Sequence, residues 1–309
     1  MSRADAKPLG PQNRGPQEMG AELMAPSPRE EMRRRAKSHV GLIFGVAIVL
    51  LAALVATFAP VLAPYDPYDQ DLAKRLVDPV WTTGDWSHIL GTDALGRDYL
   101  SRLIFGSRIS LMVGFGAALI AGTIGSVIGV LGGYFGGRVD SVVVYLINVK
   151  LALPGLLIAL SLVSIAGGSV GALVLILGFL TWDRYAVVTR SVAQQLRGSD
   201  FITAARAVCA SQTRIILSEL LPNVMNQIIV IASLEIAIVI LIEAALSFLG
   251  LGVKPPEPSW GLMIAEARSF MFFKPHMIAI PGFAIFLLVI AINMAGDGLR
   301  DVTAPEGRN

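Results

Sequence analysis

Residues 200–223, D-F-I-T-A-A-R-A-V-C-A-S-Q-T-R-I-I-L-S-E-L-L-P-N, decide the fold because they form a polar stretch between two long apolar runs. Charged side chains make contact with lipid unfavourable, and the stretch holds four of them: Asp200, Arg206, Arg214 and Glu219. Residues 203–208 are rich in alanine and favour a helix, and apolar residues then repeat at helical spacing until Pro222, which we expect to end the run. The pattern predicts two short helices joined by a turn, lying flat beneath a membrane domain where a soluble protein could press on them.

The same stretch resembles the coupling loop of the permease subunits of ATP-driven (ABC) importers. The resemblance rests on A-A-R-A-V-C-A-S-Q-T-R-I-I-L-S-E-L-L-P-N, residues 204–223. In that family the loop fits a cleft on a cytoplasmic ATPase and transmits the closure of the ATPase. The resemblance therefore implies a coupling role for nine residues: Thr203, Ala204, Ala205, Arg206, Cys209, Ala210, Ser211, Leu221 and Pro222.

Two positions of the loop differ from the family pattern. Thr203 stands where the family has glutamate, and Cys209 stands where it has glycine. Glycine tolerates a positive φ that strains a residue with a side chain. Either the turn at Cys209 keeps φ negative, or the loop is slightly distorted there.

The composition indicates a polytopic membrane protein. The 309 residues are 54% hydrophobic and 16% charged, whereas soluble domains carry about 25% charged residues. The single cysteine, Cys209, excludes an internal disulfide. The three histidines lie far apart in the sequence, so we expect no metal site.

Apolar runs divide the chain into an all-α permease domain, residues 39–302, with six predicted transmembrane helices and a cytoplasmic coupling helix. About 20 apolar residues cross a bilayer, and six runs are near or above this length: residues 40–62, 109–134, 142–165, 170–188, 224–246 and 278–294. Residues 65–108 form a predicted outer loop. Residues 1–38 form a polar tail, which we expect to be disordered and which ends in a basic cluster.

Basic residues predict the orientation. The cluster before the first span marks the cytoplasmic side and could contact anionic membrane lipid. Counted together with the tail that holds this cluster, the segments expected on that side contain more lysine and arginine than the outer segments. We therefore expect both termini in the cytoplasm.

Three further segments resemble one branch of these importers, the dipeptide/oligopeptide/nickel class. They are G-T-D-A-L-G-R-D-Y-L-S-R at residues 91–102, P-P-E-P-S-W-G at 255–261 and G-D-G-L-R-D at 296–301, and the overall resemblance covers residues 33–302. It implies the second permease of a peptide importer of the bacterial cytoplasmic (inner) membrane, working by alternating access. The implied partners are a homologous permease in a heterodimer, two ATP-binding ATPase subunits and an extracytoplasmic substrate-binding protein. A nickel chelate or another small solute is the alternative cargo.

Charged residues within predicted spans are functional candidates, because burying a charge in a membrane is costly. They are Lys150, Glu235 and Glu243. Lys150 either lines the translocation path, extends its ammonium group toward the membrane surface, or pairs with an acid elsewhere. The two glutamates lie within about 80° of each other on one helix face, and each could line the path, pair with Lys150 or a backbone group, or lie beneath another subunit.

Close helix contact is predicted where Gly125, Gly129 and Gly133 recur every four residues of the second span. The partner helix could belong to this chain or to another subunit.

The motifs that the sequence lacks limit its chemistry. It contains no G-x-x-x-x-G-K-[ST] phosphate loop, no credible catalytic nucleophile with its base, and no pattern typical of nucleic-acid binding. We therefore expect a transport subunit that is not itself an enzyme and has no cofactor, with ATP bound by partner subunits. The alternative is a gradient-driven secondary transporter using Glu235, Glu243 and Lys150, but the two halves show no inverted repeat.

Overall fold

The computed structural model describes residues 34, 36, 37 and 39–303. Within these residues the regular structure is helical, apart from an isolated β-bridge between Thr92 and Asp98. The polar tail predicted at residues 1–38, with its basic cluster, lies almost entirely outside the described residues.

Five helical segments are long and apolar enough to cross a membrane, and a bent pair brings the number to six. The five are α3 (Val40–Thr57), α6 (Tyr99–Phe135), the combined α9 (Val170–Leu180) and α10 (Trp182–Arg197), the segment Gln212–Phe248 that contains α13 (Leu221–Phe248), and α15 (His276–Thr303). The bent pair is α7 (Gly137–Leu151) and α8 (Gly155–Ala166). This agrees with the six predicted spans.

The third span is broken rather than continuous, contrary to the prediction of one run over residues 142–165. Helices α7 and α8 meet at an angle of 78°. Pro154 lies between them and precedes the first residue of α8. Proline has no N–H to donate, and it disfavours the helical conformation of the residue before it, here Leu153, so α7 ends just ahead of it at Leu151.

Pro222 does not end a helix, and the predicted stop is wrong. It lies in the first turn of α13, which follows a π-helical segment, Ile215–Leu220. The Leu221 N–H bonds to the Ile216 carbonyl oxygen, five residues back. This wider turn precedes the proline, and proline is tolerated in the first turn of a helix.

The second span begins earlier than predicted, because α6 starts at Tyr99 and not near residue 109. Asp98 caps this helix by accepting a hydrogen bond of 2.8 Å from the Ser101 N–H. The cap satisfies a backbone donor at the helix start. The last residues of the predicted outer loop are therefore the first turns of α6.

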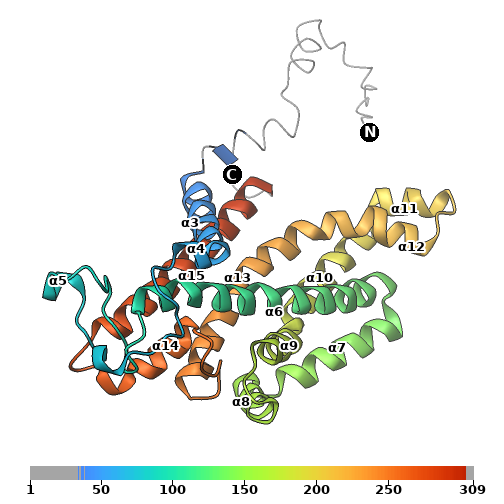
Figure 1. Cartoon of the computed structure of the whole chain (residues 1–309). Coiled ribbons are helices and arrows are strands. Elements are labelled where there is room, and N and C mark those ends of the chain that lie inside the picture. The colour runs from blue at the N-terminus through green and yellow to red at the C-terminus, as the bar shows by residue number, and fades with distance from the viewer. Residues whose placement is uncertain (1–33, 35, 38, 304–309) are drawn as a thin grey trace, which may run out of the picture.

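Helix α6 lies at the centre of the molecule, running from the side of α5 (Val80–Thr83) and α14 (Trp260–Ala267) toward α11 (Asp200–Ala207) (Figure 1). Its glycines pack against α10 of the same chain. A Cβ added at Gly125 would lie 2.2 Å from the Trp182 carbonyl oxygen, and one at Gly129 would lie 2.1 Å from the Thr189 hydroxyl. The prediction of close helix contact along this face is confirmed, and the partner helix lies within the chain.

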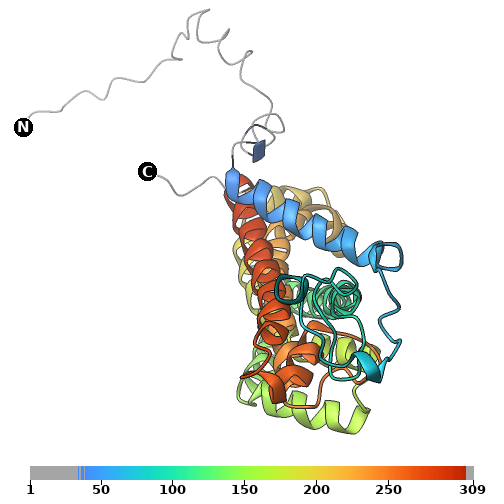
Figure 2. The same ribbon diagram turned by 60° about the vertical axis from the view of Figure 1, so that its left-hand side comes forward.

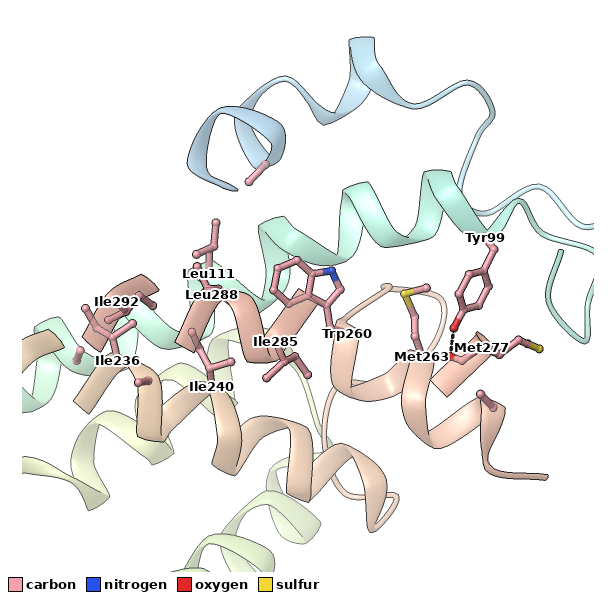
Figure 3. Close-up of a cluster of buried hydrophobic side chains, with 14 residues drawn as sticks. Tyr99, Leu111, Ile236, Ile240, Trp260, Met263, Met277, Ile285, Leu288 and Ile292 are labelled. Carbon is pink, nitrogen blue, oxygen red and sulfur yellow. Dashed lines mark hydrogen bonds between the residues drawn. The ribbon is translucent and has the colours of Figure 1, made fainter. Parts of the chain in front are cut away.

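A second packed region joins α3, α6, α13, α14 and α15. Its buried side chains include Trp260, Leu288 and Ile240, and the Tyr99 hydroxyl donates to the Met277 carbonyl oxygen (Figure 3). The start of α3 lies beside the end of α15 (Figure 2), where the His39 ring nitrogen is 3.2 Å from an Asp301 carboxylate oxygen. Both ends of the described chain therefore lie on the same side.

Short elements complete the chain. They are α4 (Ala59–Leu62), a 3-10 turn at Leu72–Lys74, α5, α12 (Gln212–Arg214), α14 and a 3-10 turn at Arg268–Phe270.

Candidate functional site

The segment of residues 199–220, named here the coupling segment, is anchored by buried apolar side chains. Ile202, Ile215 and Leu220 are fully buried. They form one cluster with Val130 and Tyr134 of α6 and with residues of α10 and α13. A force applied to the coupling segment would therefore act on the membrane helices through packed contacts.

Tyr134, near the end of α6, contacts both arms of the coupling segment. The Arg206 guanidinium lies 5.4 Å from the centre of its ring, and its hydroxyl donates to the Gln212 side-chain oxygen. The side chain is 3% exposed. Tyr134 was not predicted as a site residue; the signal that could have found it is an aromatic side chain with a polar tip at the inner end of a predicted span.

The turn at Cys209 has a positive φ of 56°. The Cys209 N–H donates to the Arg206 carbonyl oxygen at 2.9 Å, and the Ala210 N–H donates to the Ala205 carbonyl oxygen at 3.1 Å. This pair of bonds is the Schellman arrangement, which usually has glycine in the left-handed position. Of the two alternatives left open by the sequence, the structure shows the strained one, with Cys209 in a conformation that favours glycine.

A hollow of about 530 Å³ opens on the exposed side of the coupling segment. Five predicted coupling residues line it: Ala204, Ala205, Cys209, Ala210 and Ser211. Val208 also lines it and is 78% exposed. The other predicted residues lie elsewhere: the Thr203 hydroxyl bonds to the Ser199 carbonyl oxygen, Arg206 contacts Tyr134, and Leu221 and Pro222 begin α13.

Two ion pairs lie side by side within the spans. Lys150 Nζ is 2.5 Å from Asp183 Oδ1, and Arg184 Nη1 is 2.9 Å from Glu235 Oε1. Asp183 and Arg184 begin α10, so one helix end contributes to both pairs. Lys150 and Glu235 are thus brought close to one helix end without pairing with each other. Neither Asp183 nor Arg184 was predicted as a site residue from the sequence.

Glu243 is separate from this group and is completely buried. Its Oε1 accepts hydrogen bonds from the hydroxyls of Ser247, at 2.8 Å, and Ser259, at 2.9 Å. Ser259 caps α14 by accepting from the Leu262 N–H. Glu243 therefore joins α13 to the start of α14.

A buried network of charges joins the start of α6 to α14. Arg97 Nε lies 2.7 Å from Asp93 Oδ2, and Arg102 contacts both Asp93 and Glu266, the latter at 2.7 Å. Both arginine side chains are at most 3% exposed. Gly96 permits this turn, since it has a φ of 76° and a Cβ there would lie 1.8 Å from the Asp71 carbonyl oxygen. Asp93, Arg97 and Arg102 belong to the stretch at residues 91–102 that carries the family resemblance, but their ion pairs were not predicted.

Comparison with known proteins identifies the scaffold. Residues 125–308 match the family of the binding-protein-dependent transport system inner membrane component. The chain belongs to this family. Residues 27–79 also match the N-terminal transmembrane domain of oligopeptide transport permease C.

Relatives of this permease have closely similar lengths. It is 37% identical to the dipeptide transport system permease protein DppC of Haemophilus influenzae, over 91% of this chain and 95% of the relative. It is also 37% identical to the glutathione transport system permease protein GsiD of Pectobacterium atrosepticum, over 90% of this chain and 91% of the relative. The chain is a permease subunit of an ABC importer, a multi-pass membrane protein working with ATPase and substrate-binding components.

The fold agrees with this family. The permease superposes on a chain of the inward-facing MetNI methionine ABC transporter with a TM-score of 0.55 and 19% identity. The match covers 65% of this chain and 96% of the other. The all-α architecture is therefore that of an importer permease.

Proposed function

We propose that this permease moves short peptides across the bacterial inner membrane, driven by ATP hydrolysis on separate subunits. The named relatives support the cargo, since one is a dipeptide and the other a glutathione permease. Both cargoes are peptides with a free carboxylate. The absence of a phosphate loop from the sequence supports hydrolysis by partner chains.

The packing of the coupling segment carries this proposal. One end of α10 lies beside the buried Ile202, and the other end holds Asp183 and Arg184. The 16 residues of α10 form a rod of about 24 Å at 1.5 Å per residue. Closure of the ATPases would press on the hollow lined by Ala204 and Cys209, and α10 would transmit the displacement to the charged pairs.

The proposed roles follow from these positions. The residues lining the hollow contact the ATPase, Arg206 and Thr203 hold the shape of the coupling segment, and Leu221 and Pro222 connect it to α13. Lys150 and Glu235 lie along the path, whereas Glu243 serves as an anchor between α13 and α14. The partner permease forms a heterodimer with this chain, both termini lie in the cytoplasm, and the spans alternate between two packed arrangements.

An uncoupling variant tests the proposal. Ala204 is exposed and lines the hollow, so Ala204→Glu should fold normally while its bulk and charge disturb the docked ATPase. We expect the assembled importer, with its binding protein, to hydrolyse ATP in proteoliposomes but to lose most uptake of a labelled dipeptide.

A matched control adds the same charge nearby. Gln195→Glu is exposed on α10 and does not line the hollow, so uptake should persist. Normal uptake by Ala204→Glu would contradict the coupling role, and dipeptide uptake by the wild-type complex without ATP would contradict the proposed energy source.

A further inference from the structure

A hollow of about 320 Å³ lies where two helices break within the spans. One break separates α7 from α8, and the other, at Thr181, separates α9 from α10. Its charged lining residues are Lys150, Asp183 and Arg184. Most of its wall is apolar, with Leu177 and Ile238 among the contributors.

This hollow lies near the middle of the span formed by α9 and α10. Asp183 is roughly equidistant from the start of α9 and the end of α10, about 20 Å of helix from each at 1.5 Å per residue. Glu235 lies near the midpoint of α13. Charges at this depth are costly unless they face water, a ligand or a partner group.

The Arg184 guanidinium uses only part of its hydrogen-bonding capacity on its partner, Glu235. The described contact uses one guanidinium nitrogen, Nη1, on Glu235 Oε1 at 2.9 Å. The Arg184 side chain is 53% exposed, whereas Glu235 is 2% exposed. A guanidinium has five N–H donors in a planar fork, which suits the two oxygens of a carboxylate. The exposed edge of Arg184 can therefore take a second carboxylate without releasing Glu235.

Lys150 gives the hollow a second cation. Its side chain is 23% exposed and its ammonium group contacts Asp183, which is 3% exposed. The two cations and two acids balance, so the group has no net charge as it stands. Apolar walls strengthen a charged contact by limiting competing water, while the balanced charge limits affinity. A transported group must be able to bind and then leave.

We propose that Arg184, together with Lys150 of the same hollow, binds the carboxylate of the cargo as it passes the middle of the membrane. This inference rests on the proposed peptide transport and adds the chemical group that is recognised. A hollow of about 320 Å³ has room for about ten water molecules at 30 Å³ each. It therefore fits a terminal carboxylate with a small side chain and not a whole long peptide.

The experiment compares two cargoes in the complete importer. Labelled Ala-Ala and its C-terminal amide differ in the carboxylate alone, and uptake of each is measured in proteoliposomes with saturating binding protein. The binding protein is identical in every sample, so its own preference cancels when variants are compared with wild type. We expect Arg184→Gln to reduce the acid-to-amide uptake ratio about tenfold, the value of a charge-assisted hydrogen bond.

Further variants separate binding from folding. Arg184→Gln combined with Glu235→Gln leaves no unpaired buried charge, and it should lose the preference like Arg184→Gln alone. Glu235→Gln alone should keep the preference, since Arg184 remains. Arg268→Gln is the matched control, because Arg268 lies over the Phe248 ring away from the hollow.

The outcomes decide between cargo binding and a structural role. Wild-type preference in the Arg184→Gln/Glu235→Gln variant would show that the pair only neutralises buried charge, and it would overturn the proposal. Equal loss of both cargoes with an unchanged ratio would indicate a contact with a carboxylate of the partner permease and would also overturn it. If the wild-type complex imported neither cargo, the proposed peptide transport would fail instead.

Discussion

Cys209 departs from the family pattern, which has glycine at this position, yet its backbone adopts the conformation that glycine favours. Its φ of 56° is in the left-handed region, which costs a residue with a side chain roughly 1–2 kcal/mol. The Schellman bonds from Cys209 and Ala210 hold it there. The sequence located this position, but it could not decide the sign of φ, because that depends on how tightly Ile202 and Ile215 hold the two arms.

Replacing Cys209 with glycine should stabilise the turn. Glycine removes the strain but adds unfolded-chain entropy, so the net gain should be at most about 1 kcal/mol. Slower hydrogen exchange of the Ala210 amide in Cys209→Gly than in wild type would confirm it. Cys209→Ala keeps a Cβ and is the control, so equal exchange in both variants would count against strain.

Glu243 illustrates a buried carboxyl group that holds helices together. Its Oε1 accepts from both Ser247 and Ser259, so Glu243→Ala would leave two buried hydroxyls without their acceptor. Each such loss costs about 1–3 kcal/mol. The thermal unfolding midpoint of the detergent-solubilised importer should fall clearly in Glu243→Ala and less in Glu243→Gln, which keeps an acceptor oxygen. An unchanged midpoint in Glu243→Ala would contradict the anchoring role.

At the scale of elements, two prolines have opposite effects. Pro154 separates α7 from α8, whereas Pro222 lies within the first turn of α13. Both prolines are visible in the sequence, but their different effects are not. The π-helical turn at Ile215–Leu220, which precedes Pro222, depends on the tertiary packing of Ile215 and Leu220. Local pattern therefore predicts the number of spans well and their interruptions poorly.

The contact between α6 and α10 allows a direct test of packing. A Cβ at Gly129 would meet the Thr189 hydroxyl at 2.1 Å and the Ala186 carbonyl oxygen at 2.4 Å. Overpacking of this kind costs about 1–3 kcal/mol. Gly129→Ala should therefore lower the thermal unfolding midpoint of the importer in detergent.

The control for this test is Gly171→Ala in α9, where an added Cβ meets nothing within 4 Å. Alanine is the better helix former by about 1 kcal/mol, so this change should be neutral or stabilising. Equal midpoints for Gly129→Ala and wild type would show that the helices can separate at no cost.

For the candidate site, the sequence predicted the charged members but not their partners. Lys150 and Glu235 stand out because charge is rare in an apolar run. Their partners Asp183 and Arg184 lie next to each other in the chain, yet they bond to helices that are distant in sequence. The two ion pairs depend on the helix break at Thr181, after which α10 begins. No local sequence pattern predicted this break.

At the scale of the whole molecule, α6 joins the buried network of charges to the coupling segment. Its 37 residues span about 55 Å at 1.5 Å per residue. Near its start, Arg102 belongs to the network with Asp93 and Glu266, and near its end Tyr134 contacts Arg206 of the coupling segment. If binding at one end of α6 shifts this packed helix, then thermodynamic linkage requires that binding at the other end shifts it too.

This linkage predicts a remote effect of Glu266→Gln. The change removes one of two acids that neutralise the buried Arg97 and Arg102, which should loosen the attachment of α6 to α14. We expect basal ATP hydrolysis by the complete importer to stay unchanged, because in the proposed assembly the ATPases dock on the coupling segment at the opposite end. Stimulation of hydrolysis by the loaded binding protein should fall severalfold. Full stimulation in Glu266→Gln would show that the signal crosses the molecule by another route than α6.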